Sequence, residues 1–217
     1  GIIIFATIIY ACGDDNFTLT NPFADRDYEA LAISDNDSIV TFLKNHYYNR
    51  DLDTIQKITS GNESMFTDGN LSSIELVENN IDYTLYIYVK EQGNPIEEKG
   101  FPSIVDSTFT NYKLNLLVKT DSLSGLIDSN SKIWFNSYQN VRGWAHGLTK
   151  LKGGNNITNN EPIKYSNTGK AYFFVPGGLG YPSLNFQIGQ DPNERPYDQI
   201  LIFEIELLDF VKDSDHY

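Results

Sequence analysis

The chain has 217 residues, with 29 acidic and 16 basic side chains, so its formal net charge is -13. This charge repels a phosphate backbone, and no run of Lys or Arg offers a basic stripe, so we expect no nucleic-acid partner. One cysteine and three scattered histidines exclude an internal disulfide and a Cys/His zinc site. The 14 Tyr and 13 Phe residues far exceed the aromatic content of disordered acidic chains, which predicts one folded domain with extensions.

The first segment, residues 1–12, is an apolar run that stops at Gly13-Asp14-Asp15. A helix of this length reaches only about 18 Å, whereas the core of a bilayer is about 30 Å thick. The run is too short to span a membrane and has the length of the apolar region of a signal peptide. We interpret residues 1–11 as the remnant of a signal peptide that starts upstream.

The cysteine of the chain, Cys12, ends this run after Ile9-Tyr10-Ala11, and the pattern resembles the lipobox of bacterial lipoproteins. The resemblance implies that Cys12 becomes the lipidated first residue, and two or more acyl chains suffice for stable membrane attachment. Residues 12–30 then form an acidic tether, and we expect the protein in the bacterial cell envelope, facing the periplasm or at the outer-membrane surface. The alternative is a buried N-terminal strand in which Cys12 only packs.

A helical pattern follows the tether, because Ile39, Phe42 and Leu43 recur at helical spacing. Asp37 or Ser38 is the candidate N-cap. The pattern predicts one amphipathic helix of about three turns, whose apolar stripe needs a partner surface.

The next segment carries little chemistry. His46 has no second ligand candidate at helical spacing, so we assign it to the flank of the helix and treat metal binding as the less favoured alternative. Residues 50–80 are rich in Asn, Asp, Ser and Gly, which predicts loops with one or two weak strands. Residues 31–80 therefore form a helix-and-loop extension.

The remainder of the chain predicts β structure. Four segments are rich in β-branched and aromatic residues and are bounded by Gly, Pro or Asn: residues 83–89, 112–118, 171–175 and 200–208. In the last segment, Leu201, Phe203, Ile205 and Leu207 alternate with Ile202, Glu204 and Glu206. This alternation predicts an antiparallel strand with one buried face.

A short helix is predicted between the second and third of these strands. Val141, Trp144, Leu148 and Leu151 repeat at steps of three and four residues, and Gly153-Gly154 then ends the pattern in the manner of a C-cap. Such a helix lies on a sheet. Periodicity alone leaves two interpretations of Trp144 open, ordinary core packing and the floor of an apolar pocket.

Motifs for other chemistries are absent from the sequence. Gly169-Lys170-Ala171 lacks the Ser or Thr of a phosphate-binding loop, and Asp121 begins no calcium loop because no glutamate follows at the required spacing. His146 has no serine or cysteine in an elbow motif, so a hydrolytic triad is disfavoured. We expect no cofactor and no metal.

Three segments together resemble the FKBP-type peptidyl-prolyl cis-trans isomerases: residues 141–148, 175–181 and 201–208. The resemblance covers roughly residues 81–211 and places the isomerase domain at residues 81–217. It implies an α+β fold in which an antiparallel sheet wraps around a short helix and forms an apolar groove for a proline ring, here with an N-terminal helical extension. The lipobox and the extension also resemble the lipoprotein branch of this family in Bacteroidetes, of which flavobacterial gliding-associated proteins are one kind.

The resemblance also assigns the candidate site. Asp128 and Tyr181 take the catalytic positions, with Asp128 closing a turn from Gly125 that resembles the family's Gly-x-x-Phe-Asp. The pocket positions are taken by Trp144 as the floor and by Phe203, Val141, Asn140, Phe135, Ile127 and Leu117 around it. Ile127 and Leu117 stand where the family has a phenylalanine and a tyrosine.

The implied activity is isomerisation of prolyl peptide bonds in exported proteins, by a monomer whose partners are proline-containing polypeptides. Three departures support an alternative, a binding or assembly module of the envelope with a degenerate groove: Leu117, Ile127 and Arg195. Pro182, where the family usually has glycine, stiffens the loop beside Tyr181. A long insertion, residues 155–168, separates the short helix from the next strand.

Overall fold

The computed structural model describes residues 20–160 and 162–213 of the chain. Its helices are α1 (Tyr28–Asn45) and α2 (Arg142–Leu148), with 3-10 turns η1 (Ser137–Gln139), η2 (Gly177–Leu179) and η3 (Ser183–Asn185). Its strands are β1 (His46–Asn49), β2 (Thr54–Lys57), β3 (Leu71–Glu78), β4 (Ile81–Gln92), β5 (Ser107–Val118), β6 (Ser122–Leu123), β7 (Asp128–Asn136), β8 (Asn155–Asn156), β9 (Tyr165–Ser166), β10 (Gly169–Val175) and β11 (Leu201–Val211).

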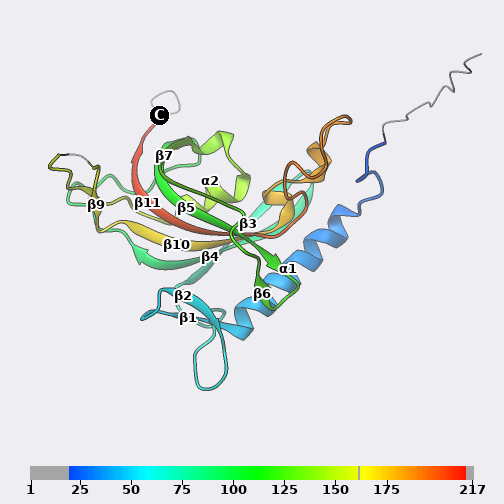
Figure 1. Cartoon of the computed structure of the whole chain (residues 1–217), viewed down its shortest axis with the longest axis horizontal. Helices are drawn as coiled ribbons and strands as arrows, with labels where there is room; N and C mark the ends of the chain where they lie inside the picture. Colours follow the sequence, from blue (N-terminus) through cyan, green and yellow to red (C-terminus); the bar gives the residue numbers. More distant parts are fainter. Residues whose placement is uncertain (1–19, 161, 214–217) are drawn as a thin grey trace, which may run out of the picture.

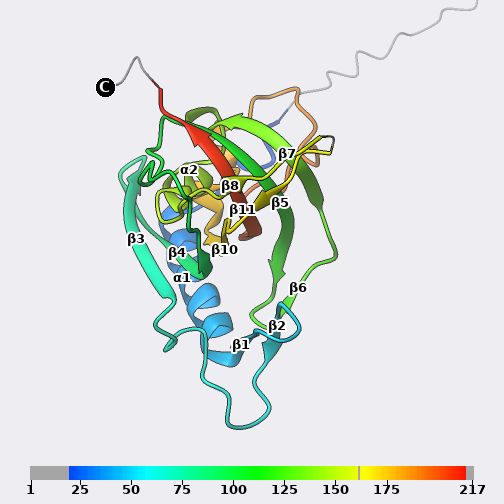
Figure 2. The same cartoon turned by 90° about the vertical axis from the view of Figure 1, so that its left-hand side faces the viewer.

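A seven-stranded antiparallel sheet forms the centre of the fold. Its strands are ordered β3-β4-β10-β11-β5-β6, and β7 pairs with β5. The sheet curves around α2, with β3 and β4 on one side of this helix and β5 and β7 on the other (Figure 2). The longer α1 crosses the opposite face (Figure 1). The predicted fold class, an antiparallel sheet wrapped around a short helix with an N-terminal helix, is confirmed.

Alternation along the strands builds two hydrophobic clusters. In β10, Phe173 and Val175 face α2, whereas Tyr172 and Phe174 face α1, because successive side chains of a strand point to opposite faces. The α2 cluster includes Tyr83, Leu85, Ile87, Leu114, Val141, Trp144, Leu148, Leu201, Phe203 and Ile205. The α1 cluster includes Ile39, Phe42, Leu43, Met65, Tyr88, Leu117, Ile200 and Ile202.

The strand predicted at residues 200–208 is confirmed, but the prediction that only one of its faces is buried is wrong. Ile202 is 1 % exposed and belongs to the α1 cluster, so the first part of β11 is buried on both faces. Glu204 and Glu206 continue that second face, where α1 no longer covers it. Both carboxylates accept hydrogen bonds there, for example from Lys90 at 2.7 Å.

Helix α1 carries the predicted stripe but begins earlier than predicted. Asp27 is the N-cap, and its side chain accepts a hydrogen bond from the Ala30 N–H at 2.9 Å. The candidate caps Asp37 and Ser38 lie inside the helix instead. Of the described helices, none has the length and apolar character needed to cross a membrane. Cys12 and the predicted signal-peptide remnant lie outside the described residues.

His46 is buried at the end of α1. Its ring stacks on Phe42 at 3.9 Å between centroids, and its Nδ1 lies 2.8 Å from the Phe42 carbonyl oxygen. In the described ranges no group of three or more His, Cys, Asp or Glu residues is placed to hold a metal ion. His46 therefore packs and caps in the described structure.

Helix α2 is a single short helix that ends at Leu148, so the predicted end at Gly153-Gly154 is wrong. Two other glycines matter more, because they let the helix approach β10 closely. A Cβ on Gly143 would overlap the Val175 side chain, and one on Gly147 would lie 2.6 Å from the Phe173 ring. This close approach brings Trp144 down onto the sheet.

Two parts of the fold were not expected from the sequence. The nine-residue strand β7 extends the sheet beyond β5, although six of its residues from Asp128 to Asn136 are polar or charged. The insertion at residues 155–168 contains the β8–β9 hairpin, in which Tyr165 contacts Phe109 edge-on at 5.8 Å. Figure 1 shows β9 at the far end of the sheet from the loop that carries Tyr181.

Candidate functional site

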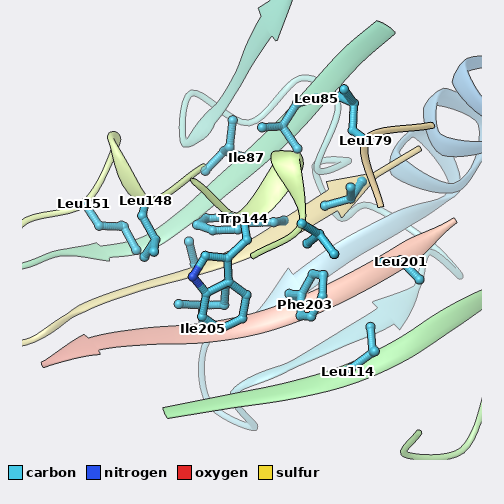
Figure 3. Packing of buried hydrophobic residues seen from close by; sticks show 14 of the residues in the cluster. Leu85, Ile87, Leu114, Trp144, Leu148, Leu151, Leu179, Leu201, Phe203 and Ile205 are labelled. Atoms are coloured by element: carbon cyan, nitrogen blue, oxygen red, sulfur yellow. The ribbon is translucent and has the colours of Figure 1, made fainter. Parts of the chain in front are cut away.

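Trp144 forms the floor of an aromatic cluster on the concave face of the sheet. Its side chain is 1 % exposed and reaches from α2 toward β11, beside Phe203 and Ile205 (Figure 3). Three rings meet the indole edge-on: Tyr112 at 5.2 Å, Phe203 at 5.3 Å and Phe135 at 5.4 Å between centroids. Aromatic rings prefer this arrangement, and it surrounds the floor with apolar carbon. The structure thus brings together three of the predicted pocket residues.

The Trp144 indole is held by packing. Its Nε1 is buried and has no hydrogen-bond partner among the described residues. An unpaired buried donor costs about 1–3 kcal/mol. The ring contacts offset that cost, so the position favours the apolar surface of the indole over its polar atom.

Tyr112 is the site residue that the sequence interpretation missed. Its hydroxyl donates a hydrogen bond to Asp128 Oδ2 at 2.7 Å, and its ring contacts Trp144, Phe135 and Phe203. Burial, the hydrogen bond and the negative charge of Asp128 raise the pKa of Tyr112 well above its ordinary value. The phenol therefore stays protonated and holds the exposed carboxylate of Asp128 at the margin of the cluster.

The prediction for Leu117 is wrong. Tyr112, Leu114 and Leu116 share the face of β5 that meets α2, whereas Leu117 points to the other face and belongs to the α1 cluster. The expected spacing of ten residues before Ile127 gave the wrong parity along the strand. Alternation along residues 112–118 was the signal that could have identified Tyr112.

Tyr181 lies at the second margin of the cluster. It comes from the loop between β10 and β11, packs partly buried against the α2 cluster, and lies under the Arg195 guanidinium at 5.5 Å. Burial raises the pKa of Tyr181, Arg195 partly lowers it, and the charge of Asp128 raises it further. The net increase keeps the phenol protonated at neutral pH, so Tyr181 is a hydrogen-bond donor.

Val141 and Asn140 lie just before α2, as predicted, and they contact each other. Val141 is 7 % exposed and packs in the α2 cluster. Its backbone N–H donates to Asn140 Oδ1 at 2.8 Å. The N–H beside the floor is therefore engaged by the Asn140 side chain.

Ile127 forms an exposed rim. It is 49 % exposed, and its N–H donates to the Leu114 carbonyl at 2.8 Å, which fixes the turn before β7. Asp128 follows directly as the first residue of β7. The predicted turn thus delivers Asp128 to Tyr112, while Ile127 adds less apolar wall than a buried aromatic residue at this position.

Two hollows flank this cluster. The smaller, of about 160 Å³, lies next to Tyr181 and is lined by Gly180, Tyr181, Pro182, Asn185, Gln190, Arg195 and Tyr197. The larger, of about 620 Å³, reaches Tyr112 but is lined mainly by polar groups such as Lys90 and Glu204. Lys90 is bonded there to both Asp53 and Glu204 at 2.7 Å, so its charge is already paired. We place the candidate site at the aromatic cluster.

Comparison with known proteins supports the architecture. No family model matches the chain, and no curated protein matches it. Among solved structures, a peptidyl-prolyl cis-trans isomerase from Pseudomonas syringae pv. tomato str. DC3000 matches with a TM-score of 0.50 and 13% identity, over 87% of this chain and 98% of that chain. The chain has an FKBP-like fold. An identity this low shows the fold alone.

A second similar structure is FkpA from Escherichia coli, with a TM-score of 0.44 and 20% identity. The match covers 67% of this chain and 54% of FkpA, so the chain spans about half the length of that protein.

Proposed function

We propose that the protein is a peptidyl-prolyl cis-trans isomerase of the FKBP type, acting as a monomer on proline-containing polypeptides. The observation that carries the proposal is the buried Trp144 floor with Tyr112, Phe135 and Phe203 edge-on around it. Two protonated phenols, of Tyr112 and Tyr181, stand at its margins. The FKBP-like fold supports this interpretation.

The chemistry needs no nucleophile and no cofactor. Rotation about a peptide bond faces a barrier of about 18–20 kcal/mol, and an X-Pro bond isomerises over tens of seconds or more. The twisted amide of the transition state has lost its resonance. A groove that binds the twisted amide more tightly than the planar one lowers the barrier. The apolar rings around Trp144 supply such a surface.

Hydrogen-bond donors at the margin add to this preference. The Tyr181 hydroxyl can donate to the carbonyl of the twisted amide, because its raised pKa keeps the proton in place. The Val141 N–H is a second donor once Asn140 turns away. The carboxylate of Asp128, fixed by Tyr112, is no donor and acts through its charge on the electron-poor carbon of the carbonyl group.

We also propose that the protein is attached to the cell envelope through lipidated Cys12 and assists the folding of exported proteins there. The lipobox at residues 9–12 and the acidic residues after it support this proposal, as they support the narrower assignment to the Bacteroidetes lipoprotein branch. Cys12→Ala in the producing cell is expected to move the protein from the membrane fraction to the soluble fraction. Retention of Cys12→Ala in the membrane fraction would refute lipid anchoring.

A second candidate function is a binding or assembly module of the envelope. Asn140 occupies the Val141 N–H, and Ile127 leaves one wall open, so two features expected of an active groove are altered. Tyr112 removes a third ground for this alternative, because it supplies the aromatic ring that Leu117 lacks.

Isomerisation of a proline tetrapeptide by the purified full chain separates the two functions. We expect the wild type to isomerise the peptide faster than the uncatalysed rate. Trp144→Leu should lower kcat/KM by at least about tenfold, equivalent to about 1.4 kcal/mol. The matched control Phe42→Leu, on the opposite face of the sheet, should show no loss. A folded wild-type protein without activity would support the binding module instead.

A further inference from the structure

The loop at residues 176–200 holds Tyr181 through one buried carboxylate. The side chain of Asp198 is 7 % exposed. Its Oδ1 accepts a hydrogen bond from the Ser183 N–H at 2.8 Å, and its Oδ2 accepts another from the Ser183 hydroxyl. Its own N–H donates to the Tyr181 carbonyl at 3.0 Å. Asp198 thus bonds to Tyr181 itself and to the residue two positions after it.

The backbone around Asp198 is closely fixed. Asp198 has φ of 56°, in the left-handed region that a non-glycine residue adopts at a cost of roughly 1–2 kcal/mol. Gly177 packs against it so tightly that a Cβ on Gly177 would lie 2.6 Å from the Asp198 carbonyl carbon. The surrounding contacts therefore impose this conformation, and they close the loop near its two ends.

The N-terminal segment reaches the same point. Arg26 Nε lies 3.7 Å from Asp198 Oδ2, and the Tyr28 hydroxyl lies 3.0 Å from the Ser183 hydroxyl. Further along the loop, Phe23 contacts Phe186 at 5.2 Å between ring centroids. Figure 1 shows the segment before α1 (blue) next to this loop (orange). Segments more than 150 residues apart in the sequence therefore meet at Ser183.

A buried carboxylate is stable only when donors compensate for the water it has lost. The desolvation of the Asp198 carboxylate is compensated by the hydrogen bonds from Ser183 and by the charge of Arg26. The Ser183 hydrogen bonds also orient the chain next to Tyr181. We propose that Asp198 is a positioning residue for Tyr181, and that Arg26 and Tyr28 tie this position to the N-terminal segment. The consequence for isomerisation rests on the proposed function, whereas the consequence for the orientation of Tyr181 does not.

A double-mutant cycle tests the kinetic consequence. Asp198→Ala is expected to lower kcat/KM about tenfold, Asp198→Asn to stay within about threefold of the wild type because the amide oxygen still accepts the Ser183 N–H, and the exposed control Glu194→Ala to change nothing. In the Tyr181→Phe background, Asp198→Ala is expected to add less than about twofold, because both changes act through one phenol. Equal losses in the two backgrounds would overturn the proposal.

A measurement without turnover tests the orientation itself. The full chain is labelled with ¹³C-tyrosine, and the Tyr181 ring signal is assigned from its loss in Tyr181→Phe. Asp198→Ala and Ser183→Ala are expected to shift that signal, Asp198→Asn and Tyr28→Phe to shift it less, and Glu194→Ala to leave it in place. An unmoved Tyr181 signal in folded Asp198→Ala and Ser183→Ala would refute the positioning role. If the wild type shows no isomerisation, the proposed function fails while this measurement still decides the position of Tyr181.

Discussion

The two faces of the sheet are built by the same alternating strands and yet serve different ends. On one face, the 18-residue helix α1 covers a closed cluster in which Ile39, Leu43 and Met65 are fully buried. On the other, α2 has only 7 residues, so Tyr112 and Tyr181 remain partly exposed at its margins. The length of the covering helix decides which face is only a core and which keeps an open apolar surface.

The largest effect on stability is expected from removing a buried side chain on the face that α1 covers. Phe42 is 1 % exposed and packs on Phe174, so Phe42→Ala should lower the free energy of unfolding by about 3–5 kcal/mol. Isomerisation by the folded fraction should stay unchanged, because the site lies on the other face. Urea unfolding measures the first quantity and kcat/KM under folding conditions the second. A drop in kcat/KM beyond the folded fraction would show that the faces are coupled.

The next effect tests the middle of α1, where Asp35 meets the start of the loop that carries Tyr181. Asp35 is buried and accepts a hydrogen bond from the Gly177 N–H at 2.8 Å. Burial raises the pKa of Asp35 to about 6, opposed by the Gly177 N–H and reinforced by the charge of Asp198. The native state therefore binds the proton more tightly than the unfolded chain, and stability falls as the pH rises from about 4 through about 6.

Asp35→Asn removes this titration and keeps an acceptor for Gly177. Its stability relative to the wild type is expected to rise between pH 4 and pH 7, by up to about 3 kcal/mol, as measured by urea unfolding at both pH values. Asp37→Asn, an exposed change on the same helix, is the control and should show no such trend. A difference that is constant with pH would contradict the assignment.

A smaller effect distinguishes two tyrosine hydroxyls on opposite faces. Tyr112→Phe removes the hydrogen bond to Asp128 at the open face and should lower kcat/KM about ten- to fifteenfold, in keeping with about 1.5 kcal/mol for a bond to a charged group. Tyr86→Phe removes the 3.0 Å bond to Asn36 beside α1 and should cost about 1 kcal/mol of stability without loss of activity. Equal activity losses in the two variants would remove the distinction between the faces.

The smallest expected effect is a decrease in KM. Asn140→Ala frees the Val141 N–H for a substrate carbonyl, so KM is expected to fall about threefold, which corresponds to about 0.6 kcal/mol. Asn130→Ala is a matched control, because Asn130 also accepts from the next backbone N–H but lies on the exposed strand β7. An unchanged KM in Asn140→Ala would show that the side chain already moves aside at no cost.

The strongly periodic segments were predictable from the sequence. The alternation in residues 201–208 predicted a buried strand face, and the steps of three and four residues around Trp144 predicted a helix packed on the sheet, because burial selects large apolar side chains at these positions. The meeting of Phe203 and Trp144 was implied only by the resemblance to the FKBP family. The stripe of Ile39, Phe42 and Leu43 was predictable for the same reason.

The errors arose where tertiary contacts override local patterns. Asp37 and Ser38 resembled the start of a helix, but α1 is capped by Asp27 and both lie inside it, beyond Asp35, whose carboxylate binds the Gly177 N–H. Strand β7 shows little hydrophobic alternation, since its exposed polar residues are held by pairing with β5. Tyr112 was missed because the ten-residue spacing before Ile127 selected Leu117, which lies on the opposite face of β5.

The contact between the N-terminal segment and the loop of Tyr181 also limits how far the folded domain can lie from Cys12. Asn21 lies nine positions after Cys12 and is the first residue with a hydrogen bond in the described part of this segment, and a fully extended chain over nine positions spans at most about 32 Å. If Cys12 is lipidated, as we propose, a chain of this length keeps the open face of the sheet within a few nanometres of the bilayer surface. The polypeptides within reach would then be those that emerge at, or are inserted into, the same membrane.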